Sequence, residues 1–518
     1  MKKQNTEETK KVSLIEKIGS KIPDPVIIFI GLFAIVMIVT AFLGGTEFVT
    51  KQVVDGVESD KVNTILNMFT KENMRWLFDN MLLTNWLGYG NGILGMILIV
   101  MFGIGIAEES GLFSALIRKV GGNIPERLLP YLLVFLGIMS NLASDAGYII
   151  LIPLAGLLYL GMKKNPLIGM FAAFAGVSAG FSANLIPATI IDVIIGNNAK
   201  IFAESANIPF MSYLGKELNP YTMHYYFMIA STVLLVLLGG FITNRFVKPK
   251  FEKISYTVPE DMTMSNFGIS DVERKGLRWA GIGFLLSLAF VVFLAMVPLA
   301  PYVDENGSKV TPYLDNIIIL ITFVFFTSGA FYGFSTKNFK SSQDVISAMS
   351  KQIGSMGYTI VLTFFSYNFL AVLSHTGLGT YITYLGAKAL EAIGAAHSAT
   401  LLIIGFIIIT AIINLFVGGL TSKWLLLGPV FIPMLYQANP NMTPDVVAAA
   451  YRLADSSTNI ITPLMTYAGV ILVYMRKYKK DFSVGDLIGA MFPYSASFLV
   501  AWTLLLLGFI AFGIPLGF

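Results

Sequence analysis

The sequence predicts an all-α polytopic membrane protein with about nine transmembrane helices plus two re-entrant hairpins, arranged as an inverted-topology repeat. Three observations lead to this fold class. The composition is more apolar than that of a soluble domain, and apolar runs of membrane length recur along the chain. In addition, two double-length apolar tracts each begin and end on one side of the predicted membrane.

Composition places the chain in a lipid bilayer. Of its 518 residues, 55% are hydrophobic and 13% are charged, whereas soluble domains carry about 25% charged residues. The small net charge of +4 gives no reason to expect a nucleic-acid partner. The absence of cysteine excludes disulfides, zinc–thiolate sites and cysteine nucleophiles. The three histidines, His224, His375 and His397, are too far apart in sequence to indicate a metal cluster.

Apolar runs long enough to cross a bilayer define the full spans. The first follows a polar, basic N-terminal tail and lacks a small-residue cleavage pattern, so we expect it to be retained as a helix. Two longer tracts, 166–198 and 444–475, are helical in pattern but interrupted by polar residues and proline. The full spans are expected near 25–44, 91–108, 221–244, 276–299, 315–335, 355–373 and 486–516.

Lysine and arginine set the predicted orientation, because short cytoplasmic loops are enriched in both. The N-terminal tail carries six lysines, and the loop 245–275 is also basic. We therefore expect both to be cytoplasmic. The loops 45–85, 199–220 and 300–313 have mixed or acidic charge and are expected outside.

Two double-length tracts, 128–162 and 398–437, are predicted to be hairpins. The first lies between the basic stretches "IRKVGGNIPER" and "MKKNP", so both of its ends belong on the cytoplasmic side. Its two halves are each shorter than a typical span. The polar stretch "SNLASDAGY" (140–148) is therefore expected at the hairpin tip. The number of spans that precede the second tract places both of its ends on the outer side, so it is expected to enter the membrane from there.

An internal repeat supports the paired hairpins. "FSANLIPATI" (181–190) resembles "SSTNIITPLM" (456–465), and "MSNL" (139–142) resembles "IINL" (412–415). Inverted repeats of this kind are typical of secondary transporters, although serine and asparagine also serve as packing contacts between helices. The predicted divisions are a tail (1–23), scaffold helices (24–127), repeat 1 (128–245), a cytoplasmic loop (246–275), further scaffold helices (276–352) and repeat 2 (353–518).

Polar residues at the hairpin tips and helix breaks form two candidate ion sites, since carbonyl, amide and hydroxyl oxygens suit small cations. The alternative is that these side chains only satisfy the broken backbone. The first set is Asn141, Ser144, Asp145, Ser182 and Asn184. The second set is Asn414, Asp455, Ser457 and Asn459, with Asn414 and Asp455 as candidate sodium ligands.

The stretch "AAAYRLADSSTNIITPLM" (448–465) carries the clearest candidate site. Arg452 and Asp455 are three residues apart and share one face of a helix. Ionisable residues inside a membrane are costly and usually functional, and arginine binds carboxylates through two hydrogen bonds. A structural ion pair is the alternative. Nearby, Lys423 is either a site cation or a surface lysine, and Trp424 either stacks on a substrate or marks the membrane interface.

Motifs of several enzyme classes are absent from the sequence. The chain contains no phosphate-binding P-loop and no HExxH motif, and no run resembles a potassium-channel filter. We therefore expect neither an enzyme nor an ATP-driven pump, and no cofactor.

At these same residues the sequence resembles the p-aminobenzoyl-glutamate transporter (AbgT) family. The matching stretches are "SNLASDAGYIILIPLAG", "GVSAGFSANL", "SKW" after "NLFVGG", and "YRLADSSTNIITPLM", and the similarity covers nearly the whole chain. The resemblance implies a homodimer with nine transmembrane helices and two hairpins per protomer. It also implies uptake of p-aminobenzoyl-glutamate or export of sulfonamide antimetabolites, driven by a proton or Na⁺ gradient across a bacterial cytoplasmic membrane.

The resemblance also implies roles for individual residues. Arg452, Trp424, Thr421, Ser422, Pro444, Pro463 and Asp192 would bind substrate, and Asp455, Asn414, Asn459, Ser457, Asn141, Asn184 and Asp145 would couple the ion. One position departs from the family pattern, because the family's aspartate on the first broken helix precedes a proline and that register here holds Ile191. Asp192 comes one place later, which turns a helical side chain by about 100°.

The expected function is thus secondary transport of an aromatic acid across the cytoplasmic membrane. A Na⁺-coupled dicarboxylate carrier of the same superfamily is the alternative within this fold. An anion or solute channel is the alternative from a different class.

Overall fold

The computed structural model describes residues 23–54, 57–89, 92–121, 125–141, 147–258, 269–303, 309–392, 397–415, 419–462 and 467–518. It is mostly helical, as the sequence predicts. Within the described residues, six helices are long and apolar enough to cross a membrane. They are Pro25–Leu43, Tyr225–Phe251, Asp271–Met296, Ile317–Thr336, Gly357–His375 and Val484–Ala511.

Each predicted full span coincides with a helix, because a helix pairs the backbone N–H and C=O groups of an apolar run with one another where no water is available. Helix α10 continues through a π-helical turn (Thr243–Val247) into α11 (Lys248–Phe251). The helices on these spans are α2 (Pro25–Leu43), α4 (Ile93–Glu109), α10 (Tyr225–Ile242), α12 (Asp271–Met296), α14 (Ile317–Thr336), α16 (Gly357–His375) and α22 (Val484–Ala511).

Capping residues in the sequence set where several helices begin. Ser270 and Glu273 form a capping box at the start of α12, and Ser483 and Asp486 form one at the start of α22. In a capping box the two side chains satisfy backbone N–H groups that have no partner within the helix. A third box opens α9 (Ile190–Ser205) and involves a site residue described below.

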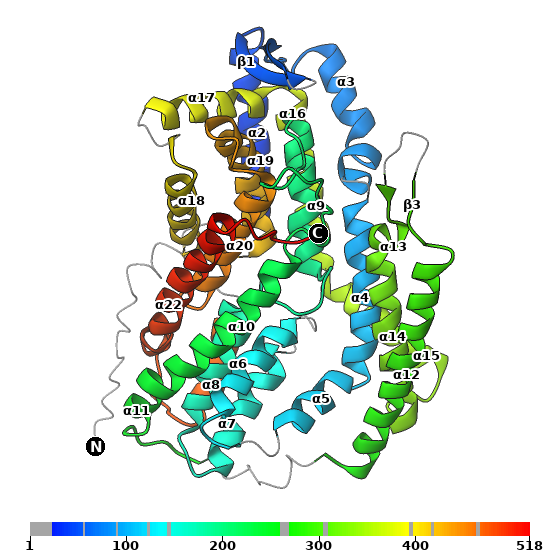
Figure 1. Ribbon diagram of the computed structural model, residues 1–518, viewed down its shortest axis with the longest axis vertical. Coiled ribbons are helices and arrows are strands. Elements are labelled where there is room, and N and C mark those ends of the chain that lie inside the picture. The colour runs from blue at the N-terminus through cyan, green and yellow to red at the C-terminus, as the bar shows by residue number, and fades with distance from the viewer. Residues whose placement is uncertain are drawn as a thin grey trace, which may run out of the picture.

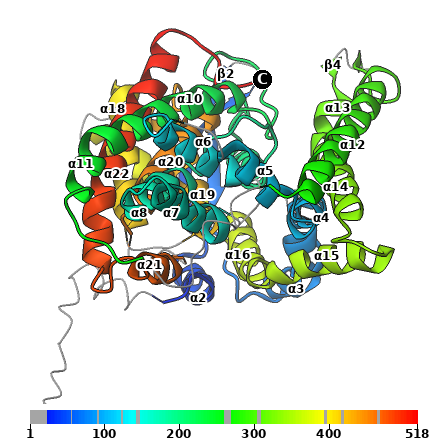
Figure 2. The same ribbon diagram turned by 90° about the horizontal axis from the view of Figure 1, so that it is seen from below.

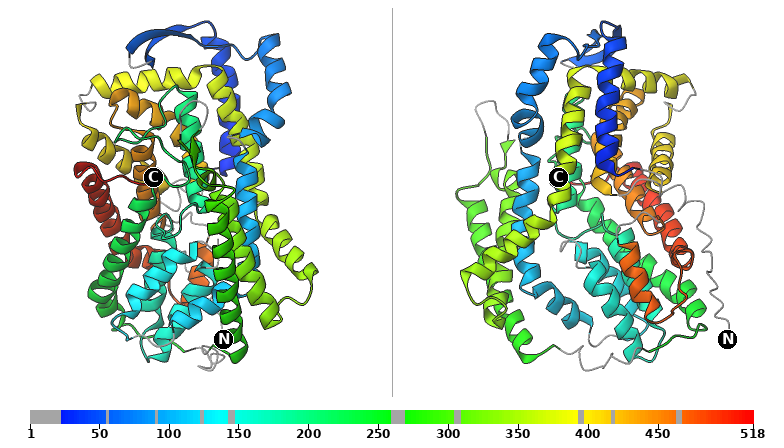
Figure 3. Two further views of the ribbon diagram at one scale, coloured as in Figure 1. Left: turned by 45° about the vertical axis from the view of Figure 1, so that its right-hand side comes forward. Right: turned by 180° about the vertical axis from the view of Figure 1, so that it is seen from behind.

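The two double-length tracts are each a pair of helices. The first comprises α6 (Leu129–Ser140), a π-helical turn (Gly147–Leu151) and α7 (Ile152–Gly161), and the second comprises α18 (Ala399–Asn414) and α19 (Leu420–Ala438). Figure 1 places α6 and α7 in the lower half of the molecule and α18 and α19 in the upper half, and Figure 3 agrees. Ser144 and Asp145 at the first tip lie outside the described residues.

Each interrupted tract contains two short helices separated by a break. The first runs through α8 (Pro166–Phe174), a π-helical turn (Ala175–Ala179) and, after the break, α9. The second runs through α20 (Pro444–Asn459) and α21 (Ala468–Arg476). Pro463, in the second break, lies outside the described residues. α20 is buried from Pro444 to Thr458, which places its polar side chains inside the protein.

The prediction of a purely α-helical chain is wrong in two loops. β1 (Glu47–Val54) pairs antiparallel with β2 (Val57–Thr64), and β3 (Tyr302–Val303) pairs with β4 (Lys309–Val310). These hairpins are short and largely polar, so a search for apolar runs of membrane length does not detect them. The same search also missed several polar or amphipathic helices. They are α3 (Lys71–Asn80), α5 (Leu112–Gly121), α13 (Pro312–Asp315), α15 (Ser342–Ser355) and α17 (Leu378–Ala392).

The helices form two groups. Seen from below, α4, α12, α14 and α15 stand together beside the larger group that contains both hairpins (Figure 2). Within the larger group, α20 packs against α9, α18, α19 and α22. The polar faces of the two hairpins and the two broken helices therefore meet in the interior of this larger group.

Candidate functional site

Arg452 connects three segments at the centre of the larger group. Its Nη1 donates to Asp192 Oδ1 at 2.7 Å, and its Nη2 donates to the backbone carbonyl of Ser182 at 2.8 Å. Its Nη1 also lies 3.1 Å from His224 Nδ1. The side chain is 1% exposed. A buried guanidinium needs such partners, since an isolated charge in this environment is strongly unfavourable.

His224 is held in one neutral tautomer by these contacts. Arginine only donates hydrogen bonds, so His224 Nδ1 accepts from Arg452. His224 Nε2 therefore carries the proton and donates to the carbonyl of Asp445, at 2.9 Å. No role for His224 was predicted, because neither its spacing nor its neighbours in the sequence indicate that it contacts a residue 228 positions away.

Asp192 reaches the site despite its departure from the family register. It is the third residue of α9, where its Oδ2 accepts from the backbone N–H and the hydroxyl of Thr189 at 2.9 and 2.8 Å. Ala188, just before this cap, has φ +55°, a left-handed conformation. This local turn and the capping box orient the carboxylate so that its other oxygen faces Arg452.

A second buried ion pair joins α19 to α20. Lys423 Nζ lies 2.6 Å from Asp455 Oδ1, and both side chains are 1% exposed. The same ammonium donates to Asn414 Oδ1. Asn414 Nδ2 donates to the Asp455 carbonyl at 2.6 Å and to the Thr458 hydroxyl at 2.8 Å. The two oxygens expected to bind sodium are thus together, but they surround the ammonium of Lys423.

The expected contact between Arg452 and Asp455 is therefore replaced by two separate ion pairs. The side chains leave α20 at positions three residues apart, and each meets a partner from a different helix: Asp192 on α9 or Lys423 on α19. Lys423 is fully buried and does not extend to the membrane surface. The spacing of Arg452 and Asp455 in the sequence did not indicate their partners, which are distant in sequence.

Trp424 is a fully buried packing residue in this structure and not part of an interface belt. Its Nε1 donates to the carbonyl of Ile195 at 3.2 Å. Its ring lies 4.7 Å from that of Tyr451 and 5.9 Å from that of Phe202. It thus joins α9, α19 and α20 in one layer.

The remaining predicted residues mostly satisfy local backbone. Asn141 Nδ2 donates to carbonyls at the end of α6, and Asn184 Oδ1 accepts from the N–H of Ile186 at 2.9 Å. Ser457 donates to Leu453 O at 2.6 Å, and Ser422 donates to Gly419 O at 3.2 Å. Asn459 differs, because its Nδ2 donates at 3.2 Å to the hydroxyl of Ser178, beside the first break. Pro444 is the first residue of α20.

A cavity of about 300 Å³ lies where the hairpins and broken helices meet. Tyr148 and Tyr467, both in its wall, stack with ring centroids 4.5 Å apart and planes 13° apart. Arg452, Trp424 and Asp192 are absent from the lining and lie behind it. The polar side chains that line this central cavity include Asn141, Thr421, Asp455 and Asn459, and its apolar wall includes Phe181, Ile190, Ile191, Ile194 and Leu420.

The described residues contain no group of three or more histidine, cysteine, aspartate and glutamate side chains that could hold a metal ion. The chemistry available at the centre is instead that of two buried ion pairs beside an aromatic-walled cavity. Such a site can bind an organic anion and respond to a proton or a monovalent cation.

Comparison with known proteins gives consistent matches over nearly the full length. The model of the family described as "AbgT putative transporter family" matches residues 10–518. The p-aminobenzoyl-glutamate transport protein of Escherichia coli (strain K12) is 28% identical over 511 residues, which cover 97% of this chain and 95% of that protein.

Two solved structures share the fold. The crystal structure of the Alcanivorax borkumensis YdaH transporter, described as having an unusual topology, matches with a TM-score of 0.85 at 32% identity, over 96% of this chain and 100% of that one. MtrF of Neisseria gonorrhoeae, described as illuminating a class of antimetabolite efflux pumps, matches with a TM-score of 0.81 at 33% identity. The second match covers 95% of this chain and 96% of that one.

Proposed function

Because the chain belongs to the AbgT transporter family, which is a family of multi-pass membrane transporters and not of enzymes, we propose that it is a secondary active transporter of p-aminobenzoyl-glutamate or a related antifolate- or sulfonamide-type solute. Two relatives, one described as a p-aminobenzoyl-glutamate transport protein and one as belonging to a class of antimetabolite efflux pumps, support this substrate class. Such a substrate combines an aromatic ring with an acidic or polar group.

The central cavity is the observation that carries the proposal. It is lined by both hairpins and both broken helices, the arrangement in which transporters bind substrates near the membrane midplane. The stacked rings of Tyr148 and Tyr467 offer an aromatic surface, and Asn141, Asn459 and Thr421 offer hydrogen-bonding groups. Its volume of about 300 Å³ is at the lower end of the range for small-molecule sites.

Arg452 would bind the substrate carboxylate by exchanging partners. In the described conformation its guanidinium is occupied by Asp192, so it is not yet available to the cavity. A proton taken up by Asp192 would weaken this ion pair and free the guanidinium for a bidentate contact with the substrate. Substrate binding and proton binding would thereby be linked.

The Lys423–Asp455 pair gives a second way to couple a cation. Asp455 lines the central cavity, and the Lys423 ammonium already occupies the two oxygens that suit a sodium ion. A sodium ion would therefore compete with Lys423 for Asp455 and Asn414. The coupling ion is accordingly a proton or Na⁺, acting through one of the two ion pairs.

The proposed architecture has nine membrane spans and two hairpins in an inverted repeat, with repeats at 128–245 and 353–518. The segments 24–127 and 276–352 would form the scaffold and the homodimer contact. The N-terminus and the loop 246–275 would face the cytoplasm, and the protein would lie in the bacterial cytoplasmic membrane. Alternating access would then move the hairpin-bearing repeats against the scaffold.

Flux of radiolabelled p-aminobenzoyl-glutamate in proteoliposomes tests the proposal. We expect saturable flux and counterflow, with acceleration by an imposed proton or Na⁺ gradient. Absence of p-aminobenzoyl-glutamate flux, together with saturable flux of labelled succinate, would instead support the dicarboxylate carrier. Conductance without saturation or counterflow would support a channel.

A further inference from the structure

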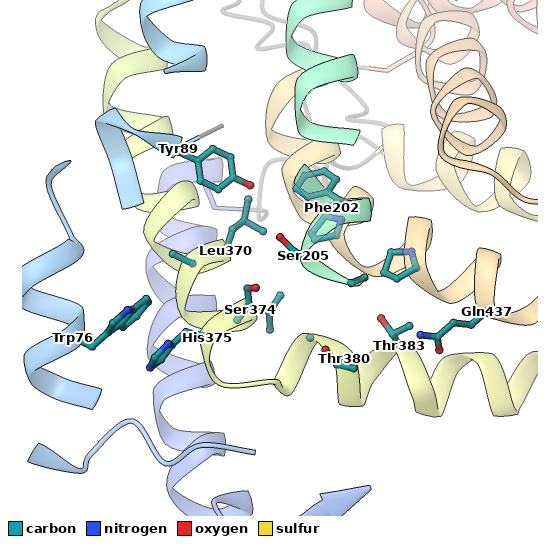
Figure 4. A pocket seen from close by; sticks show the side chains of 16 residues that line it. Trp76, Tyr89, Phe202, Ser205, Leu370, Ser374, His375, Thr380, Thr383 and Gln437 are labelled. Carbon is teal, nitrogen blue, oxygen red and sulfur yellow. The ribbon is translucent and has the colours of Figure 1, made fainter. Parts of the chain in front are cut away.

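A second cavity of about 300 Å³ lies between α9, α16, α17 and α19, with contributions from Trp76 and Tyr89 (Figure 4). We call it the Thr383 cavity. It shares α9 and α19 with the central cavity but uses the opposite ends of both helices. Ile190 and Thr421 line the central cavity, whereas Phe202 and Pro433 line the Thr383 cavity.

The layer between the two cavities is formed by packed aromatic rings. Phe202 is in the wall of the Thr383 cavity, and its ring packs 5.9 Å from that of Trp424, which is fully buried. Trp424 packs in turn on Tyr451 of α20. The cavities are therefore distinct, and a ligand in one does not touch the lining of the other.

The lining of the Thr383 cavity is uncharged. Among the described residues that form it, none is an aspartate, glutamate, lysine or arginine. Its flat surfaces come from Trp76, Tyr89 and Phe202, and Trp76 stacks on His375 with ring centroids 3.6 Å apart. A charged ligand would lose its hydration here without gaining a counter-charge, so the wall favours an uncharged aromatic ring.

Two buried hydroxyl groups in this lining have no hydrogen-bond partner among the described residues. They are Oγ1 of Thr383, a residue 1% exposed, and Oη of Tyr89. In Figure 4 they approach the cavity from different sides, Tyr89 beside Phe202 and Thr383 beside Gln437. Buried polar groups are normally hydrogen-bonded, so these two hydroxyls indicate where a bound molecule would place its polar ends.

We propose that the Thr383 cavity is a second ligand site, separate from the central cavity, for an uncharged single-ring aromatic compound with a hydrogen-bonding group at each end. The ring packs against Tyr89 and Phe202, and the polar ends bond to the hydroxyls of Tyr89 and Thr383. This site does not depend on the identity of the transported substrate.

A matched pair of probes tests the preference for an uncharged ligand. 4-Aminobenzamide and 4-aminobenzoate share the ring and the amine and differ in whether the other end is a neutral amide or a carboxylate. In calorimetric titration of the full-length protein in detergent, we expect the amide to bind this site at least about tenfold more tightly than the carboxylate, equivalent to about 1.4 kcal/mol.

Threonine-to-valine variants test the location. Thr383→Val removes a hydroxyl without a protein partner, so the fold should retain its melting temperature while amide affinity falls about tenfold. Thr410→Val is the matched control, because Thr410 of α18 also has a buried hydroxyl without a described partner but lines neither cavity. Ala371→Phe, in the lining, should abolish amide binding by filling the space.

The proposal is overturned if the amide binds Thr383→Val, Tyr89→Phe and Ala371→Phe as tightly as the wild type, which would mean that the amide binds outside this cavity. It is equally overturned if amide binding is lost in Arg452→Gln but kept in Ala371→Phe, because the probe would then be in the central cavity.

Discussion

The guanidinium of Arg452 donates a 2.7 Å hydrogen bond to the carboxylate of Asp192, although the two residues are 260 positions apart in the sequence. This contact joins α20, which belongs to the second broken tract, to the start of α9 in the first. The two charges neutralise each other inside the protein. In the proposed mechanism the substrate anion takes the place of Asp192 on Arg452, which makes this ion pair the control point.

Removal of the Lys423 ammonium should create a sodium site. In Lys423→Met the oxygens of Asp455 and Asn414 lose their cation, and a sodium ion would replace it. We expect NaCl, compared with choline chloride, to stabilise this variant by up to about 2.7 kcal/mol at a hundredfold excess over the dissociation constant. Thermal unfolding in detergent measures the effect.

The control for this experiment is the double variant Lys423→Met/Asp455→Asn, which lacks both charges. It should not respond specifically to sodium. A sodium response of Lys423→Met no larger than that of the double variant would contradict a cation site at these oxygens.

His224 should act as a positioning residue for Arg452. His224→Leu leaves Arg452 Nη1 with one partner fewer and the Asp445 carbonyl without its donor. We expect a loss of about 1–3 kcal/mol in the free energy of unfolding, and an increased KM for p-aminobenzoyl-glutamate because the guanidinium is less well oriented. His397→Leu, at an exposed position, is the matched control. An unchanged KM in His224→Leu would exclude the positioning role.

Trp424 should contribute mainly through packing. Trp424→Ala removes a fully buried ring between Tyr451 and Phe202, so we expect a loss of about 3–5 kcal/mol in the free energy of unfolding. Trp424→Phe keeps a ring and loses the hydrogen bond to Ile195, which corresponds to about 1 kcal/mol. Chemical denaturation of both variants measures the difference. Equal losses in both would show that the indole N–H, and not the ring, is the important group.

The ion pairs of Glu126, a residue outside the spans, should make stability depend on pH. The ion pair with Lys248, at 2.6 Å, together with the charge of Lys164, holds the pKa of Glu126 below its ordinary value of 4.5. A lowered carboxylate pKa stabilises the fold above the ordinary value, and this contribution is lost as the pH falls below it. Because Glu126 is 31% exposed, we expect less than about 1 kcal/mol.

Lys248→Met isolates this contribution. The difference in melting temperature between wild type and variant should be present at pH 7 and should shrink as the pH is lowered towards 4. Lys200→Met, at an exposed pair with a 3.8 Å separation, is the control for loss of one surface charge. A difference that grows as the pH falls would have the wrong sign for this explanation.

The membrane-spanning elements were predictable because lipid allows so few alternatives. Twenty apolar residues in a row form a helix in a bilayer, and the polar stretch inside 128–162 predicted that this tract holds two short helices, which are α6 and α7. The amphipathic α15 and α17 escaped prediction, since their apolar residues lie on one face and do not form a continuous run.

The sequence indicated which charged residues lie inside apolar tracts, but it did not indicate which residues they contact. Arg452 and Asp455 are conspicuous as charges inside an apolar tract. Their partners depend on which helices lie beside α20, and nothing local in the sequence encodes that Asp192 and Lys423 converge there. His224 could have been suspected from its place just before an apolar span, but its contact with Arg452 requires the fold.

The exchange of Arg452 between Asp192 and the substrate is tested most directly by the dissociation constant of p-aminobenzoyl-glutamate in purified Asp192→Asn and Arg452→Gln proteins. Asp192→Asn removes the competing charge, so it should bind the substrate more tightly than the wild type. Arg452→Gln should bind it at least about a hundredfold more weakly, equivalent to about 2.8 kcal/mol. Unchanged affinity in Arg452→Gln, or weaker affinity in Asp192→Asn, would contradict the account.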